Sequence, residues 1–171
     1  MTIPTRRKYT APQEGQPLMT VIVSGYKTPV LEVKFSNLIK PFFYPNSPNV
    51  PRYSITCVID PKEHKQFLSQ IQGIEQAEQV QSILKNETRK EGNDVVTTGK
   101  LLLKFQSKNL IPVFVIEGNN APEEIDLTDE LAKSEQIHIM YDVLRYTKKN
   151  AFNPEHGISF KPTAIYYYPK Q

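Results

Sequence analysis

Apolar and polar residues alternate along several short stretches of the chain. In 30–36, Leu31, Val33 and Phe35 are separated by Glu32 and Lys34. A period of two puts alternate side chains on opposite faces of a strand, so one face of each stretch is expected to enter a core. We predict strands at 20–27, 30–36, 52–59, 99–106, 111–117, 136–146 and 157–168, with 99–106 and 111–117 forming a hairpin. The same alternation assigns Phe35, Tyr53, Phe105 and Phe160 to the core, together with Phe67, Phe114 and Cys57.

The spacing changes to three and four residues after Asp60. Asp60 and Pro61 are typical of a helix start, with the aspartate as N-cap and the proline in the first turn. We therefore predict helix from this point to about Glu91, as one helix or as two separated near Gly73. The segment 39–51 holds four prolines, which favour an irregular loop because proline cannot donate to a strand ladder.

Many strands with one intervening helix argue against a regular alternation of strands and helices. We predict a mainly β fold: an OB-type antiparallel barrel of five to six strands, with one prominent helix between the third and fourth strands. Residues 1–19, with three prolines and three adjacent cations, are expected to form a flexible arm. Residues 20–171 are expected to form a single domain.

Composition narrows the function classes. The 21 Lys and Arg barely outnumber the 18 Asp and Glu, but the acids gather in 117–135, which predicts separate basic and acidic surfaces. One cysteine and three scattered histidines make no zinc set, and the sequence has none of the common nucleotide-binding or hydrolase motifs. We expect no enzyme activity, no cofactor and no metal. Without a secretory signal or a long apolar run, we expect a cytoplasmic protein that does not bind membranes.

Cations and aromatic rings are interleaved, most densely in 145–168. Single-stranded nucleic acid is bound by such a combination, because rings stack on bases and cations neutralise phosphates. On the predicted strands, Lys34, Arg52, Lys100 and Lys104 lie on the faces opposite the core. Further candidates for phosphate contact are Lys40, Lys108, Arg145, Lys148, Lys149 and Lys161.

For the rings outside the strands, burial and binding remain equally open. Phe42, Phe43 and Tyr44 lie in the proline-rich segment, and Phe152 lies in a lysine-rich one. A solvated loop also explains the basic segment near the C-terminus. In the tyrosine triplet 166–168, alternation puts the middle ring on the face opposite its neighbours.

Two blocks resemble the bacteriophage single-stranded DNA-binding proteins of the OB-fold type. They are FSNLIKPFFYPNSPNVPRYSITCVIDPKEHKQFLSQI, from residue 35, and IHIMYDVLRYTKKNAFNPEHGISFKPTAIYYY, from residue 137. The resemblance implies a protein that coats single-stranded DNA during phage replication or recombination, without sequence preference, and it leaves self-association open. It favours the cations and rings of the groove strands and their loops, which are Lys34, Phe43, Tyr44, Arg52, Lys100, Lys104, Tyr146, Lys148, Lys149 and Phe152.

One departure from that family is the ending YYYPKQ, which lacks the acidic tail that recruits replication proteins. The acidic segment 117–135 is an alternative partner surface, although simple solvation explains it equally well. The alternative function is a phage accessory or structural β-domain that binds protein partners through its aromatic surface. In that case the rings would form an interface between proteins.

Overall fold

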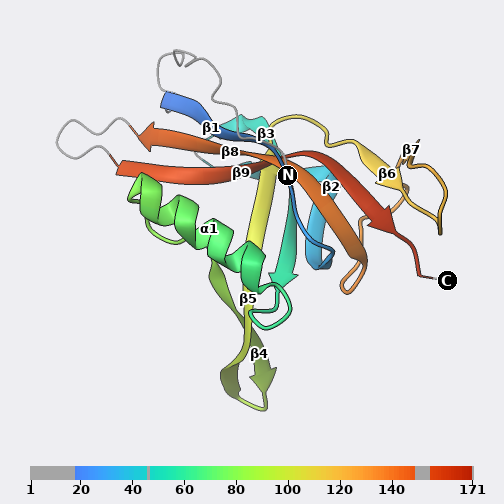
Figure 1. Cartoon of the computed structure of the whole chain (residues 1–171), viewed down its shortest axis with the longest axis horizontal. Coiled ribbons are helices and arrows are strands. Elements are labelled where there is room, and N and C mark those ends of the chain that lie inside the picture. Colours follow the sequence, from blue (N-terminus) through green and yellow to red (C-terminus); the bar gives the residue numbers. More distant parts are fainter. Residues whose placement is uncertain (1–17, 46, 149–154, 171) are drawn as a thin grey trace.

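A computed structural model describes residues 18–45, 47–148 and 155–170 of the chain. These residues form nine strands and one helix (Figure 1). The elements are β1 (Leu18–Lys27), β2 (Leu31–Tyr44), β3 (Ser47–Ile59), α1 (Lys65–Glu78), β4 (Lys85–Glu91), β5 (Asp94–Ser107), β6 (Val113–Val115), β7 (Glu123–Ile125), β8 (Gln136–Lys148) and β9 (Glu155–Tyr168).

Five of these strands close into a barrel in the order β2-β3-β5-β9-β8, with β8 returning to β2. The contact between β5 and β9 is parallel, through Phe105 and Phe160, and the other contacts around the ring are antiparallel. This is the strand order of an OB fold, so the predicted fold class is confirmed. The helix lies between the third and fourth strands, as expected, and the one parallel contact replaces the wholly antiparallel barrel that we predicted.

The inward faces of the strands form the core. Ile55, Cys57 and Ile59 of β3 are fully buried, as the alternation predicts. Burial raises the pKa of the Cys57 thiol, so this group behaves as a small apolar side chain. Tyr141 stacks on Phe160 with centroids 5.3 Å apart, and the helix adds Phe67 and Ile71 to the same cluster. The predicted core positions of Phe67, Phe105 and Phe160 are confirmed.

The helix is shorter than predicted. It begins at Lys65, with His64 as N-cap, and ends before Gln79, whose φ of 56° is left-handed. Asp60 is not the N-cap; its Oδ1 accepts a hydrogen bond from the backbone N–H of Lys62 in the preceding turn. The last part of the predicted helix, 85–91, is instead strand β4. It pairs with the first half of β5, and the hairpin projects away from the barrel (Figure 1).

Two predicted connections are wrong. The segment 111–117 does not form a hairpin with β5, because β6 pairs with β7 and, in parallel, with β9. The proline-rich segment 39–51 is not an irregular loop, because β2 and β3 continue into it as a hairpin. The pairs Phe42–Arg52 and Tyr44–Ser47 extend the ladder through register shifts that leave the prolines outside the pairing.

Among the described residues, no helix has the length and the apolar character that crossing a membrane requires. In the same residues, no three His, Cys, Asp or Glu side chains lie close enough together to bind a metal ion.

Candidate nucleic-acid interface

A bulge in β2 turns one aromatic ring out of the barrel. The β2–β3 register shifts between Val33 and Phe35, so the alternation of inward and outward side chains is reversed from this point onward. Val33 is buried, whereas Phe35 is 52% exposed and Ser36 turns inward. The predicted core position of Phe35 is therefore wrong. The ring lies on the outer face of the barrel.

Phe35 borders a groove on this outer face. Thr56 of β3 pairs with both Phe35 and Lys104, so the three side chains form a row across β2, β3 and β5. The groove has a volume of about 450 Å³, and its lining also includes Lys85, Gln106 and Tyr146. The strands β3 and β5 are the second and third of the barrel. In OB folds, the face of these two strands is the usual binding surface for oligonucleotides.

The β2–β3 hairpin places more rings beside Lys104. Phe42 and Tyr44 meet edge to face with centroids 5.0 Å apart, and Phe42 and Phe43 are 49% and 47% exposed. The ammonium of Lys104 lies 5.9 Å from the centroid of the Tyr44 ring and 3.4 Å from its hydroxyl. A cation and rings that solvent can reach are thus combined at the mouth of the groove. This is the combination that stacking on bases and contact with phosphates require.

Tyr146 reaches the groove because its partner on β9 is a glycine. Tyr146 of β8 pairs with Gly157, and a Cβ added at Gly157 would collide with the tyrosine ring. The ring therefore lies directly over the backbone of β9. The Tyr146 ring lines the groove from β8, on the side opposite Phe35 of β2.

Two polar atoms on the same face lack partners. The Nη1 of Arg52 and the Oε1 of Gln106 are buried and have no hydrogen-bond partner among the described residues. Ser54 pairs with Gln106, and Arg52 lies two residues before Ser54 along β3. An unpaired buried donor or acceptor costs on the order of 1–3 kcal/mol. A bound molecule with both acceptors and donors, such as a nucleotide, would satisfy the two groups.

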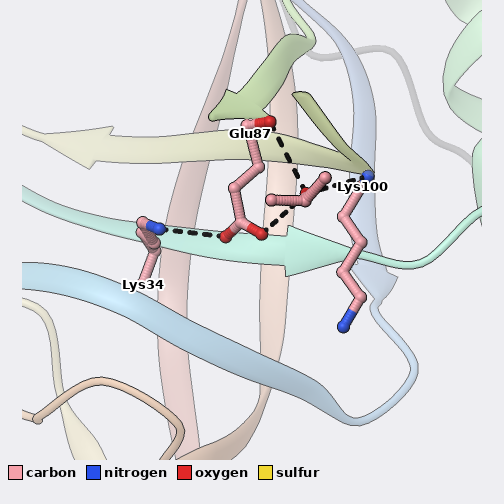
Figure 2. A network of polar contacts seen from close by, with 4 residues as sticks. Lys34, Glu87 and Lys100 are labelled. Carbon is pink, nitrogen blue, oxygen red and sulfur yellow. Dashed lines mark hydrogen bonds and ion pairs between the residues drawn. The ribbon is translucent and has the colours of Figure 1, made fainter. Parts of the chain in front are cut away.

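Lys34 lies in a different environment from Lys104. Its ammonium is 3.0 Å from a carboxylate oxygen of Glu87, and the other oxygen accepts a hydrogen bond from Thr98 (Figure 2). Burial would raise the pKa of Glu87, but the bonds from Lys34 and Thr98, with the charge of Lys100, outweigh it and lower the pKa. Glu87 is therefore ionised at neutral pH and offsets the charge of Lys34.

Lys100 also has acids nearby. The hydrogen bond from Lys62 is the main reason why the pKa of Asp60 is lowered, and the charge of Lys100 contributes to the shift. Arg145, a further candidate for phosphate contact, instead holds the end of the helix through Glu78. Lys100 and Lys104 are both exposed and are in none of the ion pairs of the described residues, but the charge of Lys100 lies near Asp60 and Glu87.

The remaining predicted site residues divide into two groups. Lys40 and Phe43 are exposed on β2, and the backbone of Lys148 ends β8. Lys149 and Phe152 lie outside the described residues. The groove residues that were not predicted from the sequence include Phe35, which the alternation assigned to the core, and Thr56, Lys85 and Gln106, which carry no distinctive signal.

The acidic segment is attached to the barrel. The carboxylate of Glu130 accepts hydrogen bonds from the backbone N–H groups of Leu38, Ile39 and Lys40, at 2.6, 2.6 and 3.1 Å. Burial opposes ionisation of this carboxyl, but these bonds outweigh it and lower the pKa. Glu130 thus attaches the acidic segment to the part of β2 that leads into the β2–β3 hairpin.

The tyrosine triplet follows the predicted alternation. Tyr166 and Tyr168 contact His138 on one face, with the Tyr166 and His138 rings stacked at 4.5 Å. Tyr167 lies on the other face against the core, and burial, with a hydrogen bond to Glu135, raises its pKa to about 12. The triplet is therefore not part of the groove.

Comparison with solved structures identifies proteins of the same architecture. The C-terminally truncated single-stranded DNA-binding protein of bacteriophage Enc34 matches over 99% of this chain and 95% of that chain, with 13% identity and a TM-score of 0.61. The same phage protein in complex with single-stranded DNA matches over 94% of each chain, with 12% identity and a TM-score of 0.61. This chain shares their fold. No protein-family model and no curated protein sequence matches it.

Proposed function

We propose that this protein binds single-stranded DNA without sequence preference, in phage DNA replication or recombination. The observation that carries the proposal is the groove on β3 and β5, where the outward ring of Phe35 and the unpaired charge of Lys104 lie in one row. The solved structure of similar fold that contains single-stranded DNA supports the same assignment.

The groove favours single strands over duplexes for a physical reason. Rings such as Phe35 and Tyr146 can stack only on bases that are not already stacked and paired within a helix. Stacking accepts any base, so these rings read no sequence. Lys104 and Lys85 supply charge for the phosphates, and the proposal needs neither a catalytic group nor a cofactor. We further propose that the protein acts in the host cytoplasm, where replication or recombination proteins would be its partners.

The test is a titration of a labelled oligo-dT, compared with a duplex of the same length at several salt concentrations. Each phosphate contact on a single strand contributes about −0.7 to the slope of log affinity against log salt. Lys104→Met is expected to lower the affinity and to reduce the slope by about this amount. The matched control is Lys90→Met, in the β4–β5 hairpin that projects from the barrel, and it is expected to change little.

A preference for the duplex, or equal effects of the two substitutions, would contradict the proposal. If no oligonucleotide binds, the alternative is an accessory or structural β-domain that contacts proteins through the exposed rings of Phe42 and Phe43.

A further inference from the structure

Three cations converge where the groove reaches the end of β5. The pair Tyr53–Ser107 ends the β3–β5 ladder, and continuing the antiparallel register by one residue sets Arg52 opposite Lys108. On the other side of β5, Phe160 pairs in parallel with Phe105, so Lys161 comes alongside Gln106. Their sequence neighbours Tyr53, Ser107 and Phe160 face the core, so the three cations are expected on the outer face that carries the groove.

None of the ion pairs formed by the described residues involves Arg52, Lys108 or Lys161. Burial, and then the neighbouring charges of Arg52 and Lys161, lower the pKa of Lys108. Asp142 lies opposite Lys161 on β8, and its Oδ1 accepts a hydrogen bond from the backbone N–H of Gly25, so one carboxylate borders the cluster on this side. Like charges held this close destabilise one another, and a bound anion would relieve the repulsion.

The guanidinium of Arg52 adds an independent observation. Its buried Nη1 has no hydrogen-bond acceptor among the described residues. A guanidinium offers several donors in one plane, an arrangement that matches the oxygens of a phosphate. An unsatisfied donor beside two lysines is thus a site for an oxyanion.

We infer that Arg52, Lys108 and Lys161 form a phosphate-binding site that holds the DNA backbone where the strand leaves the rings. The inference rests on the proposed function. The ligand is a phosphodiester of the bound strand, and the site is separate from the stacking rings. Lys108 follows the last residue of β5 and lies four residues after Lys104, or about 14 Å away at the usual strand rise. That distance corresponds to at most about four nucleotides of backbone.

The geometry makes a prediction about oligonucleotide length. An oligo-dT of about two nucleotides can occupy the rings without reaching the cluster, whereas one much longer than about four spans both. The variant Lys108→Met/Lys161→Met is therefore expected to bind the shortest oligo-dT like the unmodified protein. With an oligo-dT of about twelve nucleotides, its salt slope should be smaller by about 1.4. Over a fourfold rise in salt, its loss of affinity should be about sevenfold smaller than that of the unmodified protein.

The experiment measures these slopes for the unmodified protein, the double variant and the control Lys90→Met, after thermal melting has shown that all three fold. Oligonucleotides with and without a 5′-phosphate distinguish a terminal phosphate from the backbone, and inorganic phosphate is used as a competitor. Equal slopes for the two oligonucleotides support the backbone assignment, and dependence on the 5′-phosphate overturns it. If inorganic phosphate competes with DNA for the unmodified protein but not for the double variant, the result supports a phosphate site.

An unchanged slope in the double variant, with DNA still bound by the unmodified protein, overturns this inference and leaves the proposed function standing. If the unmodified protein binds no single-stranded DNA, the proposed function itself fails. The two failures are therefore distinguishable.

Discussion

Truncation of Phe35 to alanine should weaken DNA binding much more than it weakens the fold. The ring is 52% exposed and lies at the edge of the groove. Burying a whole phenylalanine side chain contributes about 1.5–3 kcal/mol, so the half that is buried here contributes about 1 kcal/mol to stability. Stacking on one base is worth about 1–3 kcal/mol, which corresponds to a roughly 5- to 160-fold loss of affinity.

The salt dependence separates stacking from charge. Stacking releases no counterions, so Phe35→Ala should lower the affinity for oligo-dT equally at every salt concentration and leave the slope unchanged. Phe35→Trp should keep most of the affinity, because a larger ring still stacks. The control is Val95→Ala, at a position 64% exposed in the β4–β5 hairpin. An affinity that is unchanged in Phe35→Ala, or lost only in proportion to unfolding, would refute the reasoning.

Three further substitutions test other parts of the account. Gly157→Ala should displace the Tyr146 ring and lower oligo-dT affinity without changing the salt slope; an unaltered affinity would count against a role for that ring. Glu87→Gln should free Lys34, so the slope in the same titration should steepen by about 0.7; an unchanged slope would show that the pair is purely structural. Burial, and then the charge of Lys27, lower the pKa of His138 to about 4. Below pH 6.5 the unfolded chain therefore binds a proton that the folded one does not, and stability should fall toward pH 4. His138→Phe should reduce this loss in urea unfolding, and an identical pH profile would contradict the assignment.

Much of the barrel could be predicted because apolar and polar residues alternate along several of its strands. In β3 from Tyr53 and in β5 from Leu101, every second residue faces the core, and the sequence shows this directly. The bulge after Val33 could not be predicted, because one extra residue reverses the alternation without any local signal. The strand 85–91 was missed for the opposite reason: it projects from the barrel and buries only Glu87, so it has no apolar face.

The site was harder to predict than the fold. Whether a lysine is available for a phosphate depends on neighbours that are distant in sequence, as Glu87 is from Lys34 and Glu78 is from Arg145. The predicted pairing of 111–117 with 99–106 was wrong for a related reason. Periodicity shows that a strand exists but not which strand it pairs with. Sequence identified the residue types of the interface, and their arrangement required the tertiary structure.

The most direct test of the central claim is the affinity of the unmodified protein for oligo-dT relative to a duplex of equal length, measured across a range of salt. The account predicts tighter binding to the single strand, with an affinity that falls steeply as salt rises. Equal or tighter binding to the duplex, or no binding to either, would contradict it.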